Sequence, residues 1–265
     1  MLLPQLITIA VLQGITEFLP ISSSGHLILL PQLSGWPDHG LVYDVAAHFG
    51  TLFAVLVYFR TDLVEMLTHW FANVRGARST EHSRLAWAVL WASIPVCVLG
   101  LWTHDLVVEH LRNPLVIAAM TIGFGVVLWL ADYFGRRERT TATLGWSDVA
   151  LIGLAQALAL IPGTSRSGIT ISAGLALGLT REAAARFSFL LSIPVIVFAT
   201  AYETTQIMGS GTTIDWSGLA IVTIGAGVSA FVCIATFLRL LERTGMLPFV
   251  IYRFLLGSLL IVLFI

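Results

Sequence analysis

Two short polar stretches interrupt this apolar chain and carry most of the groups that can do chemistry. The first reads QGITEFLPISSSGH over residues 13–26, and the second reads PGTSRSGIT over residues 162–170. The first contains a carboxylate, three serine hydroxyls and an imidazole, whereas the second surrounds a guanidinium with hydroxyls. Guanidinium and hydroxyl groups donate hydrogen bonds to phosphate oxygens, while the other groups supply general bases and nucleophiles. Together the two stretches indicate phosphate chemistry.

Gln13 and Glu17 are the candidates for holding a cation. They lie four residues apart, so on a helix their side chains share one face. An amide oxygen and a carboxylate on one face can jointly coordinate a divalent cation or orient a water molecule. A helix-capping or packing role is the competing interpretation for Glu17.

The serine-rich part of each stretch is a candidate anion site. Ser22, Ser23 and Ser24 stand at the predicted start of a half-helix, where free backbone N–H groups favour negative charge. The second stretch repeats the pattern and adds a guanidinium suited to a bidentate phosphate contact. Its candidate binding residues are Gly163, Ser165, Arg166, Ser167 and Thr170. Two such anion sites facing each other suit a diphosphate, although either run of serines alone could be a flexible loop.

The composition places the chain in a membrane. Of its 265 residues, 57% are hydrophobic and 11% are charged, with a mean hydropathy of +0.90, whereas soluble domains carry about 25% charged residues. The net charge of −1 leaves no excess of positive charge, so we expect no nucleic-acid partner. All fourteen basic residues are arginine, which excludes lysine Schiff bases and P-loop chemistry.

Six apolar runs are long enough for transmembrane helices, which need about 20 residues. They cover residues 41–59, 85–104, 114–132, 184–202, 216–238 and 247–265. Two further apolar regions, residues 2–34 and 147–179, are broken midway by Pro, Gly and Ser. Each can form one full span plus a loop, or two half-helices that enter and leave on the same side.

The distribution of arginine favours two half-helices in each broken region. With both regions as re-entrant hairpins, almost all loop arginines fall on one side and only Arg112 on the other, as the positive-inside rule requires. We therefore predict an all-α polytopic membrane protein with six transmembrane helices and two re-entrant helical hairpins. The arginine-rich loops 60–84 and 133–146 are then cytoplasmic, and both termini lie on the outer, periplasmic side.

Three spans follow each hairpin, which inverts the second half of the chain relative to the first. We predict one integral membrane domain over residues 1–265, arranged as an inverted-topology repeat, with repeat 1 over about 1–132 and repeat 2 over about 147–265. Each broken region contains a Gln, then a Pro, then a Ser-rich run ending in Gly; chance similarity is the alternative. Lipid cannot hydrogen-bond irregular backbone, so the two breaks are expected to meet near the protein centre.

Three other features have weaker functional interpretations. Asp44 and His48 share a helix face in the first full span. They either orient the groups of the site or form a proton path, or they are a hydrogen-bonded pair near the interface. Arg186 also lies in or near a span. Residues 60–84 contain Trp70 and Phe71 among arginines, and we expect an amphipathic helix there on the cytoplasmic leaflet.

The two polar stretches, with REAAARFSFLLSIP after the second, closely resemble the bacterial undecaprenyl-diphosphate phosphatase family, also called bacitracin-resistance proteins. The resemblance covers essentially the whole chain. It implies hydrolysis of undecaprenyl diphosphate to undecaprenyl phosphate and phosphate in the bacterial inner (plasma) membrane, which recycles the lipid carrier of cell-wall synthesis. It also implies a divalent cation, Mg²⁺ or Ca²⁺, as cofactor. The expected partners are a polyprenyl diphosphate and membrane lipid, and a homodimer is left open.

The family motifs match this chain residue by residue. The motif of Glu or Gln, three residues and Glu falls on Gln13 and Glu17, and the active-site serine and histidine fall on Ser23 and His26. The Pro-Gly-x-Ser-Arg-Ser motif falls on residues 162–167. Glutamine at position 13 removes one charge, which leaves open whether it binds metal or only donates a hydrogen bond.

For that reaction we assign Arg166, the neighbouring serines and backbone amides to the phosphate oxygens, and Glu17 to charge neutralisation with the cation. Ser23 is the preferred nucleophile, with His26 or Glu17 as its base. A phosphohistidine at His26 and a metal-activated water are the alternatives.

The competing function is a transporter or flippase of a polyprenyl phosphate or a small anion. Inverted repeats with broken helices at the midplane recur in transporters. A hydrolase requires a nucleophile and an acid near the phosphate, whereas a transporter requires only binding residues and access from both sides.

Overall fold

The computed structural model describes residues 2–37, 40–209 and 215–265. Within these ranges the regular secondary structure is helical, apart from an isolated bridge between Arg139 and Leu179. The all-α prediction is therefore confirmed. Three short turns supplement the α-helices: a π-helical turn at Val107–Leu111 and 3₁₀ turns at Thr141–Thr143 and Leu158–Leu160.

Six helices are long and apolar enough to cross a membrane, and they match the six predicted spans. They are α3 (Leu41–Tyr58), α5 (Glu81–Leu106), α6 (Pro114–Phe134), α9 (Arg181–Gly209), α10 (Trp216–Thr244) and α11 (Leu247–Phe264). Many large apolar side chains on these helices face outward, such as Trp129, Val228 and Leu255. An outward apolar surface is what a bilayer requires, so the chain is a multi-pass membrane protein.

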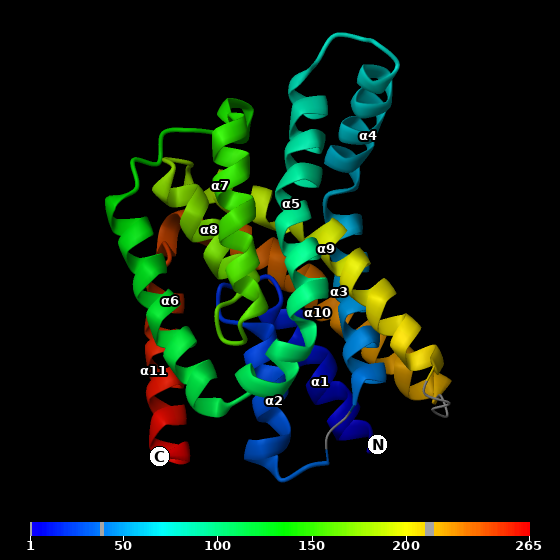
Figure 1. The fold of residues 1–265 in the computed structure, drawn as a ribbon, viewed down its shortest axis with the longest axis vertical. Coiled ribbons are helices and arrows are strands. Elements are labelled where there is room, and N and C mark those ends of the chain that lie inside the picture. Colours follow the sequence, from blue (N-terminus) through cyan, green and yellow to red (C-terminus); the bar gives the residue numbers. More distant parts are fainter. Residues whose placement is uncertain (1, 38–39, 210–214) are drawn as a thin grey trace.

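Each broken region forms two helices separated by an irregular segment. The first contains α1 (Leu3–Thr16) and α2 (Ser23–Ser34), and the second contains α7 (Trp146–Ala157) and α8 (Arg166–Ala176). In Figure 1, α1 and α2 occupy the lower half of the view and α7 and α8 the upper half, and their breaks meet near the middle. α2 and α8 run away from this junction in opposite directions, so both helices direct their N-termini toward it.

The arginine-rich connections lie together. The link between α4 and α5 and the link between α6 and α7 are at one end of the molecule, whereas the ends of α1 and α11 at the two termini lie at the other (Figure 1). The arginines predicted to be cytoplasmic in these two links thus share one end.

The helix predicted within residues 60–84 is present as α4, and it forms a hairpin with the start of α5. α4 (Arg60–Val74) ends before a short link, and the chain turns back into α5. Trp70 packs toward α5 with its ring 5.4 Å from that of Trp87, whereas Phe71 is exposed. The glycine at position 76, with a φ of 96°, permits the reversal because it has no Cβ.

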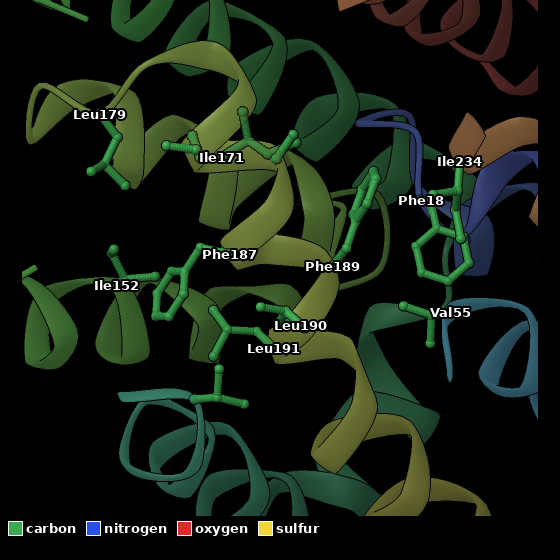
Figure 2. Close-up of a cluster of buried hydrophobic side chains, with 14 of the residues drawn as sticks. Phe18, Val55, Ile152, Ile171, Leu179, Phe187, Phe189, Leu190, Leu191 and Ile234 are labelled. Carbon is green, nitrogen blue, oxygen red and sulfur yellow. The ribbon is translucent and has the colours of Figure 1, made fainter. Parts of the chain in front are cut away.

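An apolar cluster surrounds the junction of the two breaks. Phe18, in the first break, is fully buried, and its ring meets Phe189 of α9 edge-on at 5.2 Å. Figure 2 shows Phe18 beside Val55 and Ile234, with Ile171 of α8 further along the same cluster. Edge-to-face aromatic packing and this burial hold the break at a defined height in the bundle.

Small residues let the helices around the junction approach closely. A Cβ atom added at Gly50 of α3 would lie 2.2 Å from the Thr223 carbonyl oxygen of α10, and one at Gly14 of α1 would lie 1.9 Å from Ser229 Oγ. Close backbone contact at glycine drives helix association where lipid provides no hydrophobic force. α10 therefore serves as the support on which both α1 and α3 pack.

Candidate active site

Glu17 lies at the centre of the polar cluster, directly after the last residue of α1. Its Oε2 accepts hydrogen bonds from Gln13 Nε2 at 2.9 Å and from Ser23 Oγ at 2.8 Å. The four-residue spacing on α1 therefore does place Gln13 beside Glu17. The side chain is only 7% exposed, so these contacts replace the hydration that the carboxylate loses.

Arg166 links the second break to the first. Its Nη2 lies 3.1 Å from Glu17 Oε1, and its Nη1 donates to the Ser188 carbonyl oxygen of α9 at 2.9 Å. A buried charge is stable only when it is paired and hydrogen-bonded. Glu17 and Arg166, which are 149 positions apart in the sequence, are thus each other's charged partner. The structure thus unites Gln13, Glu17, Ser23 and Arg166, as the sequence predicts.

The two breaks have the same local geometry. Ser22 and Ser165 have positive φ values of 73° and 72°, and each caps the helix that follows it. Their Oγ atoms accept from the backbone N–H groups of Gly25 and Gly168, three residues on, at 3.3 and 3.1 Å. Such a backbone conformation costs of order 1–3 kcal/mol in a residue other than glycine and is concentrated at functional sites. In this register Ser23 corresponds to Arg166.

Several side chains predicted to bind substrate form hydrogen bonds within the protein. Ser22 and Ser165 use their Oγ atoms as helix caps, and Ser24 is exposed with its Oγ 3.5 Å from Ser22 Oγ. Ser167 Oγ donates to the Leu19 carbonyl oxygen at 2.8 Å and so joins the two breaks.

Thr170 and Gly163 also form hydrogen bonds within the protein. Thr170 Oγ1 donates to the Arg166 carbonyl oxygen at 2.8 Å and lies 2.7 Å from Ser188 Oγ. The Gly163 carbonyl oxygen accepts from Arg253 Nη2 at 2.9 Å. A Cβ atom at Gly163 would lie 2.5 Å from the Ile117 carbonyl oxygen, so the break approaches α6 only because residue 163 is glycine.

His26 faces away from the Glu17 cluster. Its Nδ1 lies 2.7 Å from the Ser22 carbonyl oxygen, and its Nε2 lies 2.5 Å from the Tyr252 hydroxyl of α11. A carbonyl oxygen only accepts, so Nδ1 carries the proton and Nε2 of the neutral ring accepts from Tyr252. Ser23 hydrogen-bonds Glu17 in this arrangement, which makes Glu17 the better placed of the two candidate bases.

His48 lies next to the cluster, and Arg186 lies outside it. His48 Nε2 is 3.8 Å from Glu17 Oε2, while its Nδ1 lies 2.8 Å from the backbone carbonyl oxygen of Asp44. Asp44 therefore contacts His48 through its main-chain carbonyl group. Arg186 binds Asp62 at 2.6 Å and covers the ring of Phe59.

Arg253 of α11 is a key residue of the junction that the sequence-based prediction missed. Its side chain is fully buried, and its guanidinium donates to five main-chain carbonyl oxygens. They belong to Pro20 of the first break, Gly163 and Thr164 of the second, and Met120 and Thr121 of α6. The signal was present in the sequence, because Arg253 is the only charged residue in the span 247–265 and intramembrane charges are functional candidates.

The oxygen atoms of Gln13 and Glu17 fit part of a divalent-cation site. Gln13 Oε1 is buried and has no hydrogen-bond partner within the described residues. No group of three or more His, Cys, Asp or Glu side chains in the described part of the chain could hold a metal ion. Mg²⁺, however, is usually held by one or two protein oxygens together with substrate phosphates and water. Because Gln13 Nε2 faces Glu17, the amide would have to turn about its last side-chain bond before its free oxygen and the carboxylate could bind one cation.

The comparison with protein families decides which group of proteins this chain represents. Residues 6–259 match the family described as bacitracin resistance protein BacA. The chain belongs to the BacA family. A member from Nitrosococcus oceani, named undecaprenyl-diphosphatase, is 54% identical over 259 residues, which cover 98% of both chains. Undecaprenyl-diphosphatase 2 from Stutzerimonas stutzeri is 53% identical over 263 residues, covering 98% of this chain and 97% of the relative.

This membership confirms the resemblance that the two polar stretches indicate. A third BacA-family member, the undecaprenyl-diphosphatase of Thioalkalivibrio sulfidiphilus, is 51% identical over 98% of each chain. The match runs through all six long helices, both breaks and Arg253.

Replacing Arg253 with Met is expected to lower the thermal unfolding midpoint of the detergent-solubilised protein. The carbonyl oxygens of Pro20, Gly163 and Thr164 in the two breaks would lose their Arg253 donor, and each unsatisfied buried group costs about 1–3 kcal/mol. Arg253→Lys should fall between Met and wild type, because one ammonium cannot serve all five oxygens. Arg243→Met, at an exposed position of α10, is the control. Equal midpoints for Arg253→Met and wild type would contradict a structural role for the guanidinium.

Proposed function

We propose that this protein hydrolyses undecaprenyl diphosphate to undecaprenyl phosphate and inorganic phosphate. The observation that carries the proposal is the contact of Ser23, Glu17 and Arg166, a nucleophile, a base and a buried cation, at the junction of two helix breaks. The names of the BacA-family relatives support the lipid substrate. The product is the lipid carrier of cell-wall polymers, so the reaction returns that carrier to use in the plasma membrane.

The membrane arrangement that suits this function has α1–α2 and α7–α8 as re-entrant hairpins of a single domain. Each hairpin belongs to one half of an inverted-topology repeat, and the matching caps at Ser22 and Ser165 support that relation. The arginine-rich links face the cytoplasm under the positive-inside rule, and both termini face outward. Assembly as a homodimer stays a prediction.

In the first chemical step, Ser23 Oγ attacks the terminal phosphorus while Glu17 accepts the hydroxyl proton. The bond from that phosphorus to the bridging oxygen breaks, undecaprenyl phosphate leaves, and the phosphoryl group stays on Ser23. Arg166 contributes by turning from Glu17 to the phosphoryl oxygens, where charge builds up in the transition state. This exchange also frees Glu17 to act as a base, because its carboxylate loses its strongest partner.

In the second step, water attacks the phosphorus of phosphoserine 23. Glu17 first loses its proton to solvent, and the partly exposed imidazole of His48, 3.8 Å away, offers a route for it. Glu17 then accepts a proton from the attacking water and returns it to Ser23 Oγ as the P–O bond breaks. Inorganic phosphate leaves, and the starting state is restored.

A divalent cation, Mg²⁺ or Ca²⁺, would be held by the Gln13 amide oxygen and the Glu17 carboxylate. When bound, it supplies positive charge that neutralises the diphosphate. The unpartnered Gln13 Oε1 is the observation that supports this site. Gln13 also orients Glu17 through its Nε2 hydrogen bond, a role that does not depend on the cation.

Ser23→Ala and Arg166→Gln are expected to reduce phosphate release from undecaprenyl diphosphate by at least about 100-fold, since each removes a group that acts in the transition state. Ser34→Ala, an exposed serine at the end of α2, is the matched control and should retain activity. Brief reaction with a substrate labelled in its terminal phosphate should trap acid-stable phosphoserine at Ser23. Acid-labile phosphohistidine at His26, or full activity of Ser23→Ala, would refute the assignment. A well-folded wild type without turnover would favour lipid-phosphate transport.

Removal of divalent cations with EDTA should abolish turnover, and Mg²⁺ or Ca²⁺ should restore it. Gln13→Ala should raise the cation concentration for half-maximal activity by roughly tenfold, because it removes one ligand. Gln13→Glu should lower that concentration by adding a charge. Calorimetric titration of the substrate-free protein with Ca²⁺ provides a readout without turnover. Activity that persists after exhaustive chelation would contradict the cation site.

The membrane orientation can be measured with single cysteines in a background lacking Cys97 and Cys233. A membrane-impermeant maleimide should label Arg112→Cys in spheroplasts, because the link between α5 and α6 is predicted to face outward. It should label Arg78→Cys, in the link between α4 and α5, only after permeabilisation. The reverse pattern would overturn the proposed orientation.

A further inference from the structure

An apolar groove runs along the outer surface between α1 and α11. It has a volume of about 660 Å³, and its walls include Val11 and Ile15 of α1 and Pro248 and Phe249 of α11. The groove exists because α1 packs on α10 whereas α11 packs on α6, which leaves a gap between the two pairs. Its walls are almost entirely apolar, so water gains few hydrogen bonds there.

One end of this groove reaches the active-site junction. Tyr252 lines the groove and places its hydroxyl 2.5 Å from His26 Nε2. Leu19 also lines the groove, while its carbonyl oxygen accepts from Ser167 of the second break. Thr16, another groove residue, directly precedes Glu17. Leu19 and Thr16 therefore belong to the apolar groove and touch or adjoin the polar cluster around Glu17, while Tyr252 contacts His26 of the same break.

The other end of the groove follows α1 toward the terminus. Its walls continue to Thr8 and Ile7, and the eight helical steps from Thr8 to Thr16 span about 12 Å at the rise of an α-helix. A ligand with a phosphate at Arg166 would thus meet a long apolar wall beginning beside its head group. A molecule with an anionic head and a linear hydrocarbon chain matches both parts at once.

We infer that the groove between α1 and α11 binds the first isoprene units of the polyprenyl chain while the diphosphate occupies the junction. The inference rests on the proposed function. Binding of the head group holds the attached chain at high effective concentration beside the groove, so the substrate's own tail displaces membrane acyl chains there. Burial of the chain contributes about 25 cal/mol per Å² of apolar surface. The groove thereby selects a lipid diphosphate over a soluble one.

Thr8→Trp tests the inference, because Thr8 is half-buried, lines the groove and lies far from the reacting groups. The measurement is kcat/KM for undecaprenyl diphosphate (C55) and geranyl diphosphate (C10) in mixed micelles. We expect the bulky indole to lower kcat/KM about tenfold for C55 and less than twofold for C10. Leu255→Trp is the control, since Leu255 is exposed on α11 and lies outside the groove, and it should change neither value.

The outcomes separate this inference from the proposed function. If wild type hydrolyses neither lipid, the proposed function fails. If wild type hydrolyses C55 and Thr8→Trp leaves both values unchanged or lowers both equally, the groove does not bind the chain. A photoreactive group placed on the second isoprene unit of a C55 diphosphate gives an independent readout. It should crosslink to α1 or to the start of α11, and crosslinking confined to other helices would overturn the inference.

Discussion

The guanidinium of Arg253 holds the two helix breaks against each other, and the positions of the reacting groups depend on that contact. A chain that leaves its helical path inside an apolar region exposes carbonyl oxygens that lipid cannot hydrogen-bond. Arg253 satisfies such oxygens in both breaks and in α6 simultaneously. Its hydrogen-bond partners among the described residues are neutral carbonyls, so its positive charge also favours an anion at the junction.

The buried pair of Glu17 and Arg166 has a different role from Arg253. Burying two charges costs hydration that a simple ion pair rarely recovers in full. Here each partner keeps further hydrogen bonds, and Glu17 also contacts Ser23. In the proposed reaction the pair is the resting arrangement, and a phosphate replaces the carboxylate beside the guanidinium. The free energy lost when the Glu17–Arg166 contact breaks would be offset by the contact between Arg166 and the negatively charged substrate.

The two breaks show how one backbone design can hold different chemistry. The caps at Ser22 and Ser165 have nearly identical φ values and the same hydrogen bond to a glycine three residues on. The residue after each cap is Ser23 in one break and Arg166 in the other. Because α2 and α8 start at a common junction, equivalent positions bring the hydroxyl of Ser23 and the guanidinium of Arg166 to the same carboxylate, Glu17. In the inference drawn above, the apolar groove beside this junction holds the lipid part of the substrate.

Much of this arrangement could be predicted from the sequence. Span length is a local property, since a helix must cross about 30 Å of hydrocarbon, and all six long helices appear where the apolar runs stand. The breaks were visible as Pro, Gly and Ser within apolar sequence. The pairing of Gln13 with Glu17 followed from helical spacing. The sequence also predicts a helix within residues 60–84, but its end at Val74 and its packing on α5 depend on a tertiary contact.

The sequence by itself determined the helices, the breaks and the kinds of chemical groups that the breaks carry, because periodicity, helix capping and hydropathy act over a few residues. Only the tertiary structure decided which of those groups meet. It placed Glu17 rather than His26 beside Ser23, paired His26 with Tyr252, and brought Arg253 from the last helix to both breaks. These contacts join positions up to 233 residues apart, and they depend on how whole helices pack, which no local pattern encodes.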